Sequence, residues 1–93
     1  MIEKQVTVMN RAGIHARPAA LIAQTSNKFS SNISIKMNAG LPSEIEINAK
    51  SIMGVITMAA GYKTVLLIIA DGADEQQAVD AITTLFENKF EED

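Results

Sequence analysis

The sequence lacks cysteine, has few aromatic residues and carries no excess of positive charge. Without cysteine there is no disulfide bond and no thiolate metal site, and one histidine alone offers too few ligands for a metal ion. We therefore expect no metal and no other cofactor. The formal net charge of −3 argues against binding to nucleic acid or anionic lipid. Three phenylalanines and one tyrosine, with no paired platform on any strand, disfavour an RNA-binding sandwich.

Long hydrophobic runs are also missing. The longest run, residues 65–70, is far shorter than the ~18 residues that a transmembrane helix requires. The first residues lead directly into alternating sequence and lack the apolar core of a signal peptide. We therefore expect a cytoplasmic protein with no membrane association. The length suits one small domain, residues 1–93, which we expect to be monomeric.

Four segments have the residue pattern of β-strands. They are the residues around Val6 and Val8, residues 33–37, residues 45–49 and residues 65–69. In the first three, apolar and polar residues alternate, as in strands with one buried face. The fourth is apolar throughout, which indicates a strand with both faces covered or a central place in the sheet. Residues 38–44 contain Gly40 and Pro42 and predict a hairpin loop between the second and third strands.

Helical patterns follow the first and third strands. The first helix begins at Ala16, and its expected apolar face consists of Ala19, Ile22, Ala23, Ser26 and Phe29. Ser51 is the expected N-cap of a short second helix over residues 52–60. Gly61 lies where that helix should end.

A third helix is predicted after a capping box at residues 74–77, in which Asp74 is the cap and Gln77 its partner. Its apolar positions are Val79, Ile82, Leu85 and Phe86. The acidic residues 91–93 are expected to fray. The element order is therefore βαββαβα, which predicts an α+β fold. An open-faced two-layer sandwich, with three helices on one face of a four-stranded antiparallel sheet, buries all the apolar faces.

His15 is the only histidine and lies at the junction between a loop and the first helix. The first N–H groups of a helix have no intrahelical partner, and the helix dipole makes that end partly positive. An anion on the His15 side chain would therefore meet the backbone N–H groups of Ala16 and Arg17. The same dipole disfavours the imidazolium form and so keeps the ring nucleophilic. These residues make a place to hold a phosphoryl group.

Arg17 supplies a planar cation that can bind phosphate oxygens, and Gly13 gives the chain freedom to turn sharply beside the ring. From the residues alone, two plainer interpretations stay open. A lone histidine near a helix start is usually a surface residue, and a lone arginine is usually a solvated side chain. A Ser-His-Asp triad requires a partner geometry that the sequence does not show.

The short helix over residues 52–60 is apolar on almost every side, with Thr57 as its polar residue. A surface helix in a small domain should bury one stripe only. The residues expected to face the sheet are Val55, Met58 and Ala59. The residues then left facing outward are Ile52, Met53 and Ile56. Such an exposed apolar cluster predicts a partner-docking surface, unless the first helix or the long hairpin covers it.

Two segments resemble the signatures of one family. Residues 13–19, GIHARPA, resemble the active-site signature of HPr, the phosphocarrier of the phosphoenolpyruvate-dependent sugar phosphotransferase system. Residues 50–55, KSIMGV, resemble that family's second signature, around its regulatory serine. The resemblance covers residues 2–88. It implies a sandwich with strand order 1-4-2-3, which is consistent with a central place for residues 65–69.

The resemblance also implies roles for individual residues. His15 matches the family's histidine that is phosphorylated on Nδ1, and Arg17 matches the arginine beside the phosphate. Ser51 matches the serine modified by HPr kinase/phosphorylase. The implied donor is Enzyme I, charged by phosphoenolpyruvate, and the implied acceptors are enzyme IIA domains. The chain would then carry phosphate between enzymes without substrate turnover of its own. The residues that match the family's docking patch are Ile52, Met53 and Ile56.

The sequence departs from the family in two places. Residues 38–44 are longer than the tight hairpin usual in the family, and Ala12 stands where several members have serine or threonine. A second interpretation is an HPr-like regulator, in which the phosphorylation state of Ser51, more than transfer by His15, governs the partners. Without the resemblance, Ser51 is most simply a helix cap.

Overall fold

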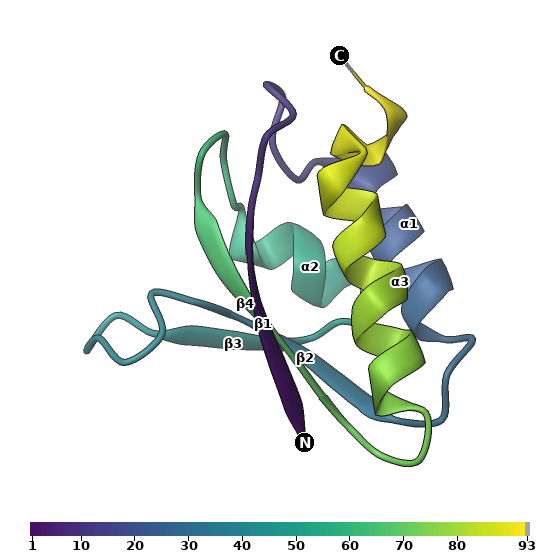
Figure 1. The fold of residues 1–93 in the computed structure, drawn as a ribbon. Coiled ribbons are helices and arrows are strands. Elements are labelled where there is room, and N and C mark those ends of the chain that lie inside the picture. Colours follow the sequence, from purple (N-terminus) through teal and green to yellow (C-terminus); the bar gives the residue numbers. More distant parts are fainter. Residues whose placement is uncertain (93) are drawn as a thin grey trace.

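A computed structural model describes residues 1–92 of the chain. Within them, four β-strands and three α-helices follow one another in the predicted order, βαββαβα (Figure 1). The strands are β1 (Ile2–Thr7), β2 (Asn32–Met37), β3 (Ile45–Asn48) and β4 (Val65–Asp71). The helices are α1 (Ala16–Ser26), α2 (Ile52–Met58) and α3 (Glu75–Glu87). No helix of this described part combines the length and the apolar content that crossing a membrane requires.

The strands of residues 1–92 form one antiparallel sheet in the order β1-β4-β2-β3. Because β4 lies between β1 and β2, Ala70 is paired with Ile2 on one side and with Ile33 on the other. The helices pack on one face of this sheet (Figure 1). The predicted α+β open-faced sandwich with strand order 1-4-2-3 is therefore confirmed.

The core lies between the sheet and the helices. Alternate residues of the inner strands point into it, and Ile35, Leu66 and Ile68 are at most 1% exposed. Of the two interpretations of the apolar run in β4, the central position is correct. The opposite face of the strand has no covering layer within residues 1–92, and Val65 on that face is 48% exposed. Pairing on both edges and burial of one face are enough to favour apolar, β-branched residues along the strand.

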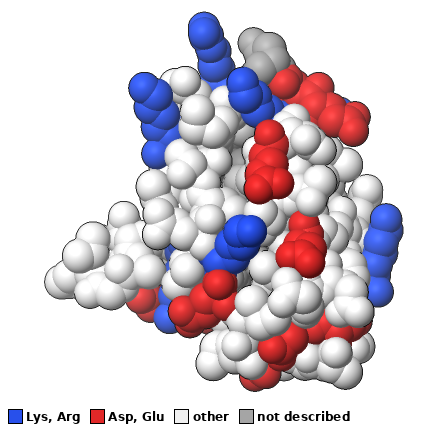
Figure 2. Space-filling view, in the orientation of Figure 1, with Lys and Arg blue, Asp and Glu red and all other residues white. Residues whose placement is uncertain are grey.

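The hairpin loop between β2 and β3, residues 38–44, is present as predicted and is internally bonded. The Leu41 N–H donates to the Asn38 carbonyl (3.0 Å), and the Glu44 carboxylate accepts from the Gly40 N–H (2.9 Å). The loop projects as the white arm at the left of Figure 2, and Leu41 is 57% exposed. It therefore extends the surface without adding to the core.

Two helices end earlier than the sequence predicts. α1 ends at Ser26, so Phe29 lies beyond it, although its side chain still packs against the core. α2 ends at Met58, and Ala59 adopts a left-handed conformation (φ 54°) whose N–H donates to the Ile56 carbonyl. A left-handed residue commonly ends a helix, but it is usually glycine because a Cβ is unfavourable there. The predicted stop at Gly61 was therefore wrong.

The predicted capping box at the start of α3 was also wrong. The Asp74 side chain does not cap the helix but accepts hydrogen bonds from the Ser30 N–H (2.9 Å), the Ser31 N–H (3.0 Å) and the Ser31 hydroxyl. Glu75 instead reaches back to accept from the Gly72 N–H (3.1 Å). Asp74 thus joins the start of α3 to the segment before β2.

These hydrogen bonds lower the pKa of Asp74 from 3.8 to about 2, and the bond from the Ser31 hydroxyl has the largest effect. Because the folded-state pKa is lowered, the contribution of Asp74 to stability is present above the unfolded value. It is lost as the pH falls from 3.8 towards about 2.

Ala59→Gly should stabilise the protein by about 0.5–1 kcal/mol, because glycine removes the cost of a left-handed L-residue. The greater conformational entropy of glycine in the unfolded chain cancels only part of this gain. The free energy of unfolding from urea denaturation measures this. Ala12→Gly is the matched control, since Ala12 is exposed and does not have a positive φ. The control should lose stability, and an equal loss in Ala59→Gly would contradict the argument.

Candidate functional site

His15 is the N-cap residue of α1. Its backbone is extended (φ −93°, ψ −163°), and its carbonyl accepts a hydrogen bond from the Ala19 N–H (2.9 Å). The imidazole does not itself cap the helix, and the side chain is 43% exposed. The backbone N–H groups of Ala16 and Arg17 follow directly and form no hydrogen bond within residues 1–92. The ring therefore lies at the positive end of the helix dipole with two backbone donors next to it in the chain.

The loop that carries His15 is pressed against the end of α2. The Ile14 N–H donates to the Ala60 carbonyl (2.9 Å). Gly13 has a φ of +74°, and a Cβ added there would lie 2.8 Å from the same carbonyl oxygen. Glycine is required at this position both for the backbone conformation and for the close approach. The position of His15 thus depends on a contact with a segment more than forty residues further along the chain.

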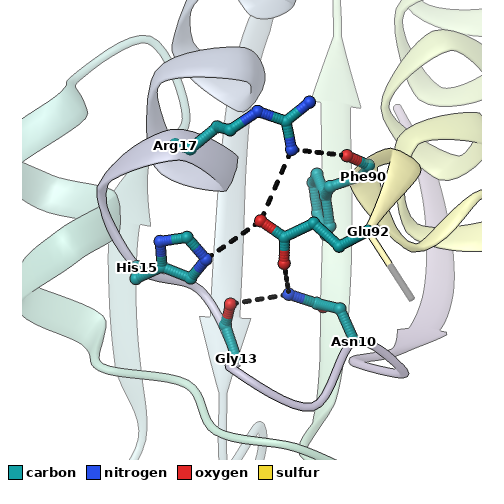
Figure 3. A network of polar contacts seen from close by, with 6 residues as sticks. All are labelled: Asn10, Gly13, His15, Arg17, Phe90 and Glu92. Atoms are coloured by element: carbon teal, nitrogen blue, oxygen red, sulfur yellow. Dashed lines mark hydrogen bonds and ion pairs between the residues drawn. The ribbon is translucent and has the colours of Figure 1, made fainter.

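A carboxylate that the sequence analysis missed lies against the ring. Nε2 of His15 is 3.0 Å from Oε2 of Glu92 (Figure 3). Oε1 of the same carboxylate accepts a hydrogen bond from Nδ2 of Asn10 (3.1 Å), which also donates to the Gly13 carbonyl (2.7 Å). Asn10 is fully buried. One buried amide therefore fixes both the carboxylate and the loop that carries the histidine.

The Arg17 side chain also points towards the Glu92 carboxylate. Its Nη1 donates to the Phe90 carbonyl (2.9 Å) and lies 3.4 Å from Oε2 of Glu92 (Figure 3). The interpretation of Arg17 as a merely solvated side chain was therefore wrong, although half of the side chain is exposed. Glu92 is the acceptor shared by the histidine and the arginine.

Hydrogen bonding keeps this carboxylate ionised. The bond from Asn10 is the largest influence that lowers the pKa of Glu92 below its usual value, and the neighbouring His15 and Arg17 lower it further. Partial burial opposes them, but the net direction is downward. At neutral pH the cluster therefore contains one carboxylate anion, that of Glu92, between the His15 ring and the Arg17 guanidinium group.

The prediction that the acidic C-terminal residues fray was wrong for Glu91 and Glu92, and Asp93 lies outside the described residues. The 3₁₀ turn η1 (Lys89–Glu91) has a positive φ at each of its three residues. Left-handed L-residues cost about 1–2 kcal/mol each. The turn carries Phe90 into the core, where it is 1% exposed and its ring packs edge-on against Phe86 (4.9 Å between centroids). Burial of Phe90 and the contacts of Glu92 offset that cost.

The start of α2 presents part of the predicted docking surface. Ser51 is the N-cap, as predicted, and its hydroxyl accepts from the Gly54 N–H (3.0 Å). Ile52 is 43% exposed and Met53 is 69% exposed, so neither α1 nor the hairpin covers them. Ile56 is only half-exposed because it packs against the core. The exposed apolar surface is therefore narrower than expected.

The inner side of α2 also differs in one residue from the prediction. Val55 and Met58 are buried, as expected, but Ala59 is exposed because the helix ends before it.

Ser51 lies at the other end of α1 from His15. The side chain of Asn27, which follows the last residue of α1, donates to the Lys50 carbonyl (3.0 Å). An α-helix of 11 residues is roughly 16 Å long. The structure therefore brings His15, Arg17 and the α1 N-terminus together, and places Ser51 near the other end of α1.

Comparison with known proteins indicates one family. The family model described as "PTS HPr component phosphorylation site" matches residues 2–88. The phosphocarrier protein HPr of Treponema pallidum (strain Nichols) is 50% identical over 93 residues, all of this chain and all of that protein. The HPr-like protein Crh of Halalkalibacterium halodurans is 40% identical, and the match covers 96% of this chain and 100% of that protein.

A solved structure agrees with these matches. The crystal structure of HPr-C-His from Thermoanaerobacter tengcongensis is 40% identical in sequence and superimposes with a TM-score of 0.90, covering 100% of this chain and 99% of that one. Three observations indicate the same family. They are the order of strands and helices, the exposed histidine at the start of α1 and these full-length similarities. The chain belongs to the HPr family of phosphocarrier proteins of the phosphotransferase system.

Proposed function

We propose that this cytoplasmic chain accepts a phosphoryl group from phospho-Enzyme I on Nδ1 of His15 and passes it to enzyme IIA domains. The observation that carries the proposal is the orientation of the ring. Nε2 faces the Glu92 carboxylate, whereas Nδ1 has no protein partner within residues 1–92. A carboxylate is an acceptor, so the ring proton belongs on Nε2 and the lone pair on Nδ1. Nδ1 is therefore the nucleophilic atom.

The N-terminus of α1 supports the phosphorylated state. The N–H groups of Ala16 and Arg17 are unpaired in residues 1–92, and the helix dipole favours an anion beside them. The guanidinium of Arg17 uses Nη1 for its contacts with Phe90 and Glu92. Its other N–H groups remain to bind phosphoryl oxygens. Transfer requires no cofactor in this scheme, because the phosphorylated donor supplies the group.

Docking is assigned to the start of α2. Ile52 and Met53 provide an exposed apolar surface, with Ile56 at its half-buried edge. An exposed apolar cluster favours protein partners, and methionine adapts to more than one of them. Enzyme I and the enzyme IIA domains would share this surface, which suits a carrier that meets donor and acceptor in turn.

Regulation through Ser51 is the second candidate function. The Ser51 side chain is partly exposed at the helix start and directly precedes the docking residues. Phosphorylation by HPr kinase/phosphorylase would place about −1.5 to −2 charges there. The resemblance of residues 50–55 to the family's second signature supports this role.

His15→Ala should abolish phosphorylation, since His15 is the only histidine and its ring is exposed. After incubation with Enzyme I and phosphoenolpyruvate, intact mass should show an acid-labile adduct on the wild-type protein and none on the variant. Circular dichroism should be unchanged. Undiminished labelling of the variant would disprove the assignment of His15.

Arg17→Ala should slow phosphoryl transfer while leaving the melting temperature near that of the wild type. Its contacts are partly exposed, and such pairs contribute about 0–1 kcal/mol. Stopped-flow transfer from phospho-Enzyme I and a thermal melt measure the two effects separately. A large loss of stability at an unchanged transfer rate would make Arg17 a structural residue.

Ser51→Asp should keep the fold but raise the apparent Michaelis constant for Enzyme I, because a charge beside Ile52 and Met53 must be desolvated when a partner docks. Genuinely phosphorylated protein should show a larger effect than this partial mimic. Ser51→Ala is the matched control, which loses the cap and about 1 kcal/mol of stability but adds no charge. Unchanged kinetics in both charged forms would leave Ser51 as a helix cap only.

A further inference from the structure

Glu92 lies outside the segment that the family model matches. The family model matches residues 2–88, whereas η1 and Glu92 follow that segment. Nevertheless the Glu92 carboxylate is in contact with the two side chains to which the proposed transfer is assigned, 3.0 Å from Nε2 of His15 and 3.4 Å from Nη1 of Arg17. The segment that the family model matches therefore does not include the carboxylate that makes these contacts.

We propose that Glu92 is a positioning residue for phosphoryl transfer, which holds the proton of His15 on Nε2 and offsets the positive charge that the ring acquires. The proposal rests on the proposed function and deepens it. Figure 3 shows the carboxylate on the Nε2 side of the ring, so it is not in the path of a group that approaches Nδ1.

The charge changes in the reaction explain why a carboxylate matters. The Nδ1 lone pair forms a bond to phosphorus while the bond from phosphorus to the donor atom breaks, and that electron pair leaves with the donor. Because Nε2 keeps its proton, the imidazole ring becomes positively charged as the Nδ1–P bond forms. An anion next to Nε2–H stabilises this charge, as the aspartate does for the histidine of a serine-protease triad. The return step, to an acceptor, reverses each of these changes.

The surroundings of Glu92 hold it in place for this role. Oε1 accepts from the buried Asn10 side chain, and Oε2 is left for His15 and Arg17. The three left-handed residues of η1 direct the chain back towards α1, and the buried Phe90 anchors the turn two residues before the carboxylate. The side chain of Glu92 is 18% exposed, which limits screening of its charge by water.

The same geometry leaves Arg17 available. Only Nη1 of the guanidinium is used by Phe90 and Glu92. Since the group carries N–H donors on three nitrogen atoms, it can bind a phosphoryl oxygen without releasing Glu92. Glu92 thus orients the cation as well as the ring.

Glu92→Gln tests the charge, because glutamine has almost the same shape and still offers an oxygen to Nε2–H. Single-turnover transfer from phospho-Enzyme I should show a maximal rate lowered about tenfold, which corresponds to about 1.4 kcal/mol of transition-state stabilisation. The apparent Michaelis constant should not change, since Glu92 is not one of the docking residues Ile52, Met53 and Ile56. Glu91→Gln, an exposed neighbour, is the matched control and should transfer at the wild-type rate. An unchanged maximal rate in Glu92→Gln would overturn the proposal.

A measurement without any donor separates this inference from the proposed function. Ring ¹⁵N chemical shifts, recorded where the imidazole is neutral, report which nitrogen carries the proton. In the wild type it should be Nε2, and in Glu92→Ala the fraction with the proton on Nδ1 should rise by about twofold or more. If the wild type is not phosphorylated but this shift occurs, the proposed function fails while the positioning by Glu92 stands. Identical shifts in the wild type and Glu92→Ala would overturn the positioning role even if phosphorylation succeeds.

Discussion

The contact between the Ile14 N–H and the Ala60 carbonyl fixes the relation between the histidine loop and the second helix. Gly13 packs against the same carbonyl so closely that no side chain fits. On the other side of the loop, Asn10 binds the Gly13 carbonyl and the Glu92 carboxylate. The end of α2, the start of α1 and the C-terminal turn therefore meet at one short loop. A displacement of that loop would change the orientation of the ring and its distance from the carboxylate together.

The features that could be predicted from the sequence are those fixed by local pattern. Alternation in β2 and β3, the apolar run of β4 and the Ser51 cap each reflect residues close together in the chain, and the structure has them. The apolar run of β4 left two interpretations open, a strand with both faces covered or a central position, and the structure has the central position. The start of α1 at Ala16 was also predicted, because it is a local junction between a loop and helix-favouring residues.

The features that were missed involve partners far apart in sequence. Asp74 binds Ser31 across 43 positions, and Glu92 meets His15 across 77 positions. The acidic composition of the last residues suggested fraying, but one signal pointed the other way. Phe90 follows Phe86 at the i, i+4 spacing of packed side chains, which indicates that the turn after α3 is anchored. No local signal identified the donor to the Glu92 carboxylate, because Asn10 lies near the opposite end of the chain.

His15 and Ser51 lie near opposite ends of one helix. His15, Glu92 and the N–H groups that are unpaired within residues 1–92 lie at the start of α1, whereas Ser51 lies near its end. Across roughly 16 Å, water and salt screen a charge on Ser51 from the ring, since the Debye length is about 8 Å at physiological ionic strength. In the proposed scheme a charge on Ser51 would therefore act on partner binding, while Glu92, in contact with the ring, would act on the transfer step. A phosphorylated Ser51 would then change partner binding without changing the reactivity of His15.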